Sequence, residues 1–300
     1  MSRRAALGLA VAVAAVSWGG PLARLVDAAP LAVAMWRMGL AGAMAIGLAA
    51  LSRGGWPRAG VWRGGLLAGI FLGVHFGLWI PSLWLTTVSA SVVLVTTAPL
   101  FVLIASPRLL GVPISGRSVI SLALALAGVV IIAGGDFLLS PRALWGDVLA
   151  LGGAIAAAGY LVVGKKLRGQ VRLVSYLAVV YAVAGAALAV ATLALGVEAM
   201  PHRASAWPVL FALAVVPTLI GHSLLNWALK FYEAFKVNLA ILLEPVFASL
   251  LAWAVLGEVP PAHVLPGAAL VLAALALEYG ALAVMKQRWR RCISGPDTAC

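Results

Sequence analysis

An acid and a proline stand side by side in the middle of a long apolar stretch. Glu244 and Pro245 lie in FKVNLAILLEPVFASLLAWAVLGE, residues 235–258, which is long enough to cross a membrane. A carboxylate in the centre of a bilayer is costly, so it marks a candidate functional site that could bind an ammonium group or a proton. Alternatively, Glu244 is a buried structural partner of Arg37 or His222. Pro245 cannot donate to the carbonyl of Ile241, which leaves that oxygen free for another partner.

The same design occurs earlier in the chain, in SVVLVTTAPLFVLIASPRLLG, residues 91–111. One constant offset of 146 residues places Pro99 on Pro245, Phe101 on Phe247 and Gly111 on Gly257. Both prolines fall near the middle of an apolar stretch, so we expect two kinked helices that frame a central cavity rather than kinks that serve packing alone. A repeated segment of this kind is typical of a transporter built from two halves.

Other polar and aromatic residues recur at matching places in the two halves. His75 and Trp79 are four residues apart, as are His222 and Asn226, so each pair lies on one face of a helix. We interpret these faces as the lining of a water-filled path, the alternative being hydrogen bonds between helices. Trp18 and Tyr160 occupy corresponding apolar stretches and could stack on a substrate, although ordinary core packing is an equal explanation.

Composition defines the class of protein. The chain is 64% hydrophobic and 10% charged, whereas about a quarter of the residues of a soluble domain are charged. Its two cysteines lie in the terminal tail, so we expect no disulfide framework and no metal site. We find no phosphate-binding loop, no HExxH and no plausible Ser–His–Asp set, so we expect no enzymatic activity and no cofactor.

We therefore expect an all-α membrane protein with ten transmembrane helices. Nothing in the chain alternates in the manner of barrel strands, and a lipid-exposed backbone must satisfy its own hydrogen bonds. The predicted spans are Ala5–Leu22, Pro30–Leu51, Gly64–Trp84, Val88–Leu110, Arg117–Gly135, Gly146–Leu167, Leu173–Leu195, Trp207–Lys230, Ala234–Leu256 and His263–Met285.

The basic residues predict the orientation. Of the 21 Lys and Arg residues, Arg24, Arg142 and Arg203 fall in connections on one side, Arg37 lies within a span, and all the others fall on the opposite side. This bias predicts that both termini lie in the cytoplasm. We expect the protein to lie in the inner membrane of the cell. The bias also indicates contact with anionic lipids and argues against nucleic acid as the partner of the +12 net charge.

Five spans per repeat is an odd number, so two consecutive repeats enter the membrane in opposite senses. We place the first repeat at residues 1–139, the second at residues 140–287 and a basic cytoplasmic tail at residues 288–300. Substrate sites of inverted repeats lie near the membrane midplane, between the halves.

The chain resembles the drug/metabolite transporter superfamily with two EamA-type repeats. The resemblance rests on SWGG at residues 17–20, APLFVLIASPRLLG at 98–111, LWGDVLALGGAIAAAGYLV at 144–162 and LEPVFASLLAWAVLGE at 243–258. The resemblance covers almost the whole chain. Within the superfamily, the chain is most readily compared with the YddG-type amino-acid exporters. The resemblance implies an exporter of amino acids and other small-molecule metabolites, and the proton that Glu244 could bind would then drive transport.

Our expectation is an exporter of small metabolites, foremost amino acids, that works by alternating access. The predicted cavity residues are Trp18, His75, Trp79, Pro99, Tyr160, His222, Asn226, Glu244 and Pro245. For Arg37 we prefer a structural role, in which it pairs with an acid or extends its side chain towards the membrane surface, over a hold on a substrate carboxylate. The alternatives are a carrier of drugs, nucleosides or other metabolites, and a membrane assembly subunit without carrier activity.

Overall fold

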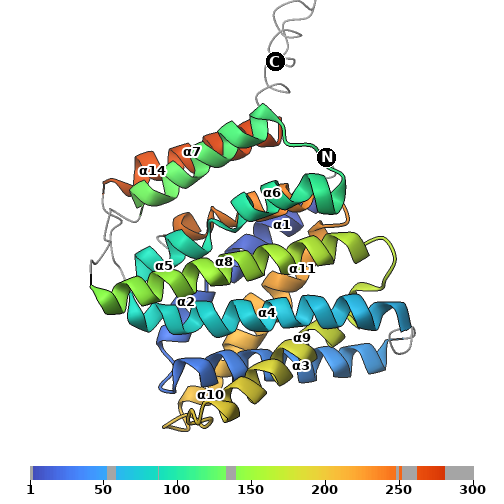
Figure 1. Ribbon diagram of the computed structural model, residues 1–300, viewed down its shortest axis with the longest axis vertical. Helices are drawn as coiled ribbons and strands as arrows, with labels where there is room; N and C mark the ends of the chain where they lie inside the picture. The colour runs from blue at the N-terminus through green and yellow to red at the C-terminus, as the bar shows by residue number, and fades with distance from the viewer. Residues whose placement is uncertain are drawn as a thin grey trace, which may run out of the picture.

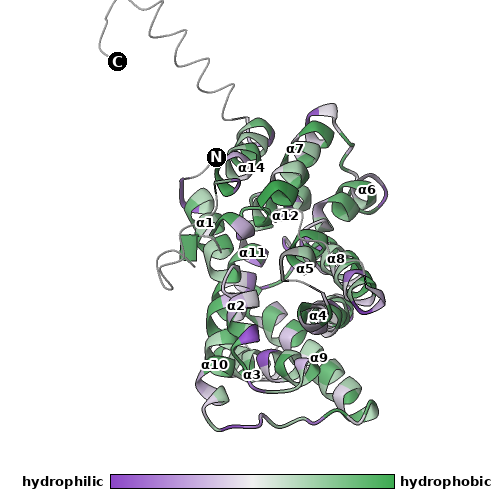
Figure 2. Ribbon diagram, turned by 90° about the vertical axis from the view of Figure 1, so that its left-hand side faces the viewer, coloured by the Kyte–Doolittle hydropathy of each residue, from purple (hydrophilic) through white to green (hydrophobic). Residues whose placement is uncertain are grey.

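The computed structural model of the chain describes residues 3–52, 59–86, 88–132, 140–247, 250–251 and 262–280. These residues form helices, and none of them lies in a strand. Most of the helices run side by side (Figure 1), and a view turned by 90° shows that they are mainly apolar (Figure 2). The predicted all-helical class is confirmed.

Each of the ten predicted spans corresponds to helix in the described residues. Seven helical stretches are long and apolar enough to cross a membrane. Four of them are continuous: α3 (Pro30–Leu51), α4 (Ala59–Leu85), α8 (Pro141–Leu167) and α9 (Leu173–Ala194). Three are interrupted: α1 (Arg3–Val16) with α2 (Gly19–Arg24), α5 (Val88–Val95) with α6 (Ala98–Leu110), and α10 (Ala206–Leu213) with a π-helix (Ala214–His222) and α11 (Ser223–Ala228). The other three predicted spans contain α7 (Gly116–Ile132), α12 (Ala234–Ile241) and α14 (Val264–Glu278).

Two helices begin five residues before the predicted boundary: α4 at Ala59 and not at Gly64, and α8 at Pro141 and not at Gly146. Ser140 caps α8, because its hydroxyl accepts a hydrogen bond from the Ala143 N–H at 3.1 Å. Proline fits the first turn of a helix, where no intrahelical donor is needed. Residues 133–139, 252–261 and 281–300, with the predicted ends of three spans and the basic tail, lie outside the described residues.

Corresponding helices of the two repeats pack directly on one another, α3 against α9 and α7 against α14. The contact between α7 and α14 depends on two glycines. A Cβ atom on Gly128 would lie 2.6 Å from the carbonyl oxygen of Gly267, and a Cβ atom on Gly267 would lie 2.7 Å from that of Gly128. Small residues let the two backbones touch, which is how helices commonly associate in lipid.

We therefore predict that Gly128→Leu forces α7 and α14 apart and destabilises the protein by about 1–3 kcal/mol, the usual cost of overpacking. The measurement is the melting temperature of the purified protein in detergent. Gly47→Leu is the matched control, because Gly47 is an exposed helical glycine with no atom near its would-be Cβ. Equal melting temperatures for both variants would show that the glycine contact is unimportant.

A cluster of charged residues joins the two repeats at one end of the bundle. His202, between α9 and α10, donates from Nδ1 to a carboxylate oxygen of Asp27 at 2.9 Å, and its backbone N–H donates to the Asp27 carbonyl at 2.9 Å. Arg203 adds an ion pair to Asp27 at 3.3 Å, and Glu198 lies 3.4 Å from Nε2 of His202. The hydrogen bond to Asp27, followed by the attraction of Glu198, raises the pKa of His202.

This raised pKa predicts a pH dependence of stability. A histidine that binds its proton more tightly in the folded state stabilises the fold below its unfolded pKa of about 6.5, and this contribution disappears as the pH rises through the folded pKa. The melting temperature of the wild type relative to His202→Gln should therefore fall between about pH 6 and pH 8. The change is small because exposed pairs are screened by solvent. A difference that stays constant over this range would contradict the assignment.

Candidate functional site

The fourth and ninth spans are both broken at mid-length, at equivalent positions. In the fourth, α5 ends at Val95 and α6 begins at Ala98, after a turn in which the Thr97 N–H donates to the Leu94 carbonyl at 3.1 Å. In the ninth, α12 ends at Ile241 and helix resumes at residues 244–247, after a turn in which the Leu243 N–H donates to the Ala240 carbonyl at 3.1 Å. The two turns stand at the offset that relates Pro99 to Pro245, so both repeats place the same break before the same proline.

Threonine side chains supply hydrogen bonds to the backbone beside the break in the fourth span. A proline removes the donor for the carbonyl four residues before it, and in lipid that carbonyl needs another arrangement. In the fourth span, threonine hydroxyls bond to carbonyls ahead of the break: Thr97 donates to Leu94 at 2.6 Å and Thr96 to Val92 at 2.8 Å. The first span has a similar break, because α1 ends at Val16 and α2 begins at Gly19.

The eighth span uses a different solution around Pro217. This proline lies in the π-helix Ala214–His222 and cannot donate to the carbonyl of Leu213. The hydroxyl of Thr218 donates to that carbonyl instead, at 3.0 Å. The same hydroxyl oxygen then accepts a hydrogen bond from Nε of Arg37 at 2.9 Å. Single π-helical segments occur frequently at functional sites, and here the segment determines where an arginine is held.

The breaks and the π-helix surround a buried cavity of about 60 Å³. A water molecule needs about 10–15 Å³ of such space, so the cavity holds a handful of waters in this conformation. Its walls come from the six spans expected from the sequence and also from the second span, through Arg37. The lining residues are Val16, Arg37, His75, Trp79, Val95, Thr96, Ala98, Ala157, Tyr160, Leu161, His222, Leu225, Asn238, Ile241 and Glu244.

Arg37 is the cation of the cavity, and only 1% of it is exposed. Its guanidinium lies over the ring of Phe76, 4.1 Å from the centroid, and Nε is bound by Thr218. Nη1 is buried without a hydrogen-bond partner. The expected extension of this side chain towards the membrane surface is wrong, because Thr218 and Phe76 hold it inside the bundle. A structural role and a role in the cavity are therefore combined in one residue.

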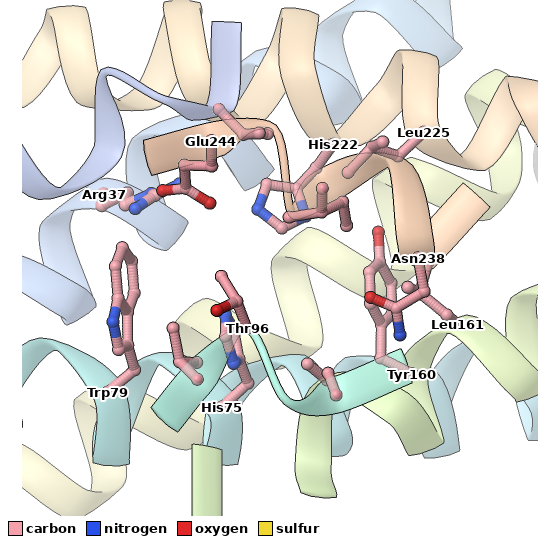
Figure 3. A pocket seen from close by; sticks show the side chains of 15 residues that line it. Arg37, His75, Trp79, Thr96, Tyr160, Leu161, His222, Leu225, Asn238 and Glu244 are labelled. Atoms are coloured by element: carbon pink, nitrogen blue, oxygen red, sulfur yellow. The ribbon is translucent and has the colours of Figure 1, made fainter. Parts of the chain in front are cut away.

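Glu244 faces Arg37 at the same end of the cavity (Figure 3). Their charges attract one another, although the two side chains do not form an ion pair within 4 Å. Burying two opposite charges near one another costs less free energy than burying a single unpaired charge. The gap between them leaves both groups able to bind a ligand.

Two histidines line the middle of the cavity (Figure 3). Nδ1 of His75 lies 2.9 Å from the carbonyl oxygen of Gly153 and its ring stacks on Trp79 at 5.8 Å. Because a carbonyl only accepts, the proton resides on Nδ1, and Nε2 of the neutral ring is left as an acceptor. His222 packs edge-on against Phe76, and its Nδ1 is buried without a partner.

The far end of the cavity is mainly apolar, with polar groups at its edge. Tyr160 stands there beside Leu161 and Asn238 (Figure 3). The hydroxyl of Tyr160 accepts a hydrogen bond from the Asn226 side chain, which also donates to the His222 carbonyl at 2.8 Å. Nδ2 of Asn238 and Nε1 of Trp79 are buried donors without partners. Together with Nη1 of Arg37, they give the site unused donors that suit a ligand with acceptor oxygens.

The structure brings together five of the predicted site residues, which are His75, Trp79, Tyr160, His222 and Glu244. The other four lie outside the cavity walls. Pro99 and Pro245 shape the breaks beside it, Asn226 holds Tyr160 from behind, and Trp18 precedes the first residue of α2. Asn226 lies in α11, one turn after the π-helix ends at His222, and its side chain amide bonds to Tyr160 and to the His222 carbonyl.

Three polar wall residues were not among the predicted site residues: Arg37, Thr96 and Asn238. Thr96 and Asn238 have a sequence signal, since both precede a proline break by a few residues in an apolar stretch. For Arg37 the signal in the sequence is a charged residue within a predicted span. The partner of Arg37, Thr218, is 181 residues away, so the direction of the arginine side chain depended on how the two repeats pack.

We predict that Thr218→Val leaves Nε of Arg37 buried and unpaired while preserving the shape of the side chain. The expected loss of stability is about 1–3 kcal/mol, measured by thermal unfolding in detergent. Thr218→Ser retains the hydroxyl and should melt near the wild type. If the valine and serine variants melt together, the hydrogen bond does not hold Arg37.

Comparisons with known proteins agree with this architecture. Residues 4–134 and residues 144–279 each match the EamA-like transporter family. One solved crystal structure of a protein matches 93% of this chain and 97% of its own, with a TM-score of 0.74 and 20% sequence identity, which shows a shared fold. The comparison with curated proteins finds no match. Because the two family matches cover most of the chain, this protein is a member of the EamA-like transporter family, a membrane protein with two EamA repeats.

Proposed function

We propose that the protein is an inner-membrane secondary transporter that exports amino acids, by alternating access around the central cavity. The observation that carries the proposal is the pair of opposite charges, Arg37 and Glu244, at one end of a buried cavity whose other end is mainly apolar. A zwitterion matches this pattern, since it presents a carboxylate and an ammonium group at one end and a side chain at the other.

Each part of an amino acid has a counterpart in the walls. The free Nη1 of Arg37 and the free Nε1 of Trp79 are donors for a carboxylate, and hydrogen bonds to charged groups are the strong ones. Glu244 is a counterion for the ammonium group. Tyr160, Leu161 and Leu225 provide apolar surface for the side chain. A ligand that carries both charges compensates both protein charges, so neither is left unpaired in a medium of low dielectric.

The size of the cavity supports a small substrate over drugs or nucleosides. A cavity of about 60 Å³ must widen to admit even a small amino acid, and it must widen far more for a multi-ring compound. The alternative of an assembly subunit without transport gives no reason for equivalent helix breaks around a polar cavity. Among the described residues that line the cavity, Glu244 is the one carboxylate, so it is where a proton would compete with the substrate ammonium group.

The remaining parts of the proposal concern the membrane. We place the repeats at residues 1–139 and 140–287, which agrees with the ranges of the family matches. The basic residues put both termini and the 288–300 tail in the cytoplasm, where anionic lipids contact them. The absence of a nucleotide-binding loop from the sequence points to a gradient as the source of energy.

Counterflow of radiolabelled amino acids in proteoliposomes tests this function. We expect uptake by the wild type, and a loss of roughly ten-fold or more in Glu244→Gln and in Arg37→Lys, since each variant loses a hydrogen bond to a charged group. Glu198→Gln is the control, because this acid lies exposed between α9 and α10, outside the central cavity.

Three further results decide among the alternatives. If Glu244→Gln and His75→Ala both leave the uptake of every amino acid unchanged, the proposed cavity is not the substrate site. If unlabelled drugs or nucleosides compete and amino acids do not, the protein carries another class of metabolite. Comparing counterflow with and without a pH gradient tests proton coupling directly.

A further inference from the structure

Two basic side chains bind backbone carbonyls at opposite ends of the helix bundle. Nζ of Lys165, near the end of α8, donates to the carbonyl of Leu229 at 2.8 Å and to that of Tyr232 at 2.7 Å. Nη1 of Arg24, at the end of α2, donates to the carbonyl of Leu83 at 3.2 Å, and its guanidinium lies 5.1 Å from the ring centroid of Trp84.

These two contacts are equivalent in the two repeats. Leu83 and Leu229 stand at the same 146-residue offset as Pro99 and Pro245, and they occupy the ends of the third and eighth spans. Arg24 and Lys165 come from the ends of the first and sixth spans, which also correspond, although these two donors stand 141 residues apart and not 146. Because the repeats are inverted, equivalent positions lie on opposite faces of the membrane. In Figure 1 the end of α4 and the end of α8 indeed point to opposite sides of the bundle.

The physical basis of each contact is the end of a helix. The last carbonyls of a helix have no intrahelical donor, and the C-terminal end carries a partial negative charge. A basic side chain donates hydrogen bonds to these carbonyls, and its positive charge is attracted to the partial negative charge of the helix end. Water can replace the side chain when the end becomes exposed, so such a contact can open and close reversibly without leaving a carbonyl unpaired.

Both contacts hold the ends of spans that line the cavity, the third through His75 and Trp79 and the eighth through His222. Lys165 lines a small pocket between α6 and the start of α12, together with Ser106, Glu233 and Phe235. These are the flanks of the two proline-broken spans on that face. On the other face, the end of α4 is held from two directions, because Nη2 of Arg142 at the start of α8 donates to the carbonyl of Trp84 at 3.2 Å.

We propose that Lys165 and Arg24 are a pair of gate latches, one for each face, and that transport opens them one at a time. This inference rests on the alternating access of the proposed function. Both latches are closed in this structure, in keeping with the small enclosed cavity. The Lys165 latch closes the cavity towards the face on which α8 ends, and the Arg24 latch closes it towards the face on which α4 ends.

The test measures the accessibility of the cavity from each face. A single cysteine replaces Val16, a wall residue, in a background in which Cys292 and Cys300 are changed to serine. A membrane-impermeant maleimide is applied to right-side-out and to inside-out vesicles. Lys165→Met should raise the labelling rate from the Lys165 face by roughly ten-fold, the effect of losing a hydrogen bond to a charged group, and lower it from the other face. Arg24→Met should do the reverse.

Matched controls separate the latches from a general effect of charge. Lys166→Met removes the exposed neighbour of Lys165, and Arg203→Met removes a basic residue that forms an ion pair with Asp27. Neither should change the labelling. Lys165→Arg and Arg24→Lys keep a cationic donor and should stay close to the wild type. Lys165→Gln and Arg24→Gln, which are milder changes, replace the methionine variants if those do not fold.

The outcomes distinguish this inference from the proposed function. Opposite shifts of labelling for the two variants support the latches even if no amino acid is transported, and the substrate assignment alone then fails. Shifts in the same direction, or no shift in variants that still perform counterflow, overturn the latches and leave the transport function in place.

Discussion

The structure depends on how a helix is interrupted inside lipid. Every backbone polar group in the hydrocarbon region needs a partner from the protein, and each proline in a span removes one donor. At Pro99 and Pro245 the chain makes a short turn and begins a new helix, and at Pro217 it widens into a π-helix. These three adjustments place Thr96 and Glu244 on the wall of one cavity and a threonine hydroxyl against Arg37. The cavity is the space that the adjustments leave between the two repeats.

The electrostatics of the cavity follow from these interruptions. Arg37 is far from solvent, and it remains there because Thr218 accepts from Nε, Phe76 lies under the guanidinium and Glu244 provides an opposite charge. Thr218 can do this because its hydroxyl is turned towards the carbonyl that Pro217 leaves free. A proline in the second repeat thus positions a cation of the first, and the donor that this cation leaves unused is available to a ligand.

Much of this arrangement could be predicted from the sequence because it is periodic. Runs of apolar residues indicated ten spans, and the constant offset between Pro99 and Pro245 indicated equivalent breaks, both of which the structure contains. Residues whose role depends on contacts between the repeats could not be placed in the same way. Arg37 was expected to extend towards the surface, because nothing local to its span indicates Thr218 as its partner. Asn226 was expected on the cavity wall, but its amide bonds to Tyr160 and to the His222 carbonyl, and a spacing pattern does not show such contacts.

The central claim is that Arg37 and Glu244 together bind the two charges of one small ligand. The most direct test is the affinity of the purified protein for leucine, for the amine that lacks its carboxylate and for the acid that lacks its ammonium group, measured by calorimetry. The account predicts that leucine binds roughly ten-fold or more tightly than either analogue, because each analogue leaves one buried charge without a partner. Equal affinity for leucine and for either analogue would contradict it.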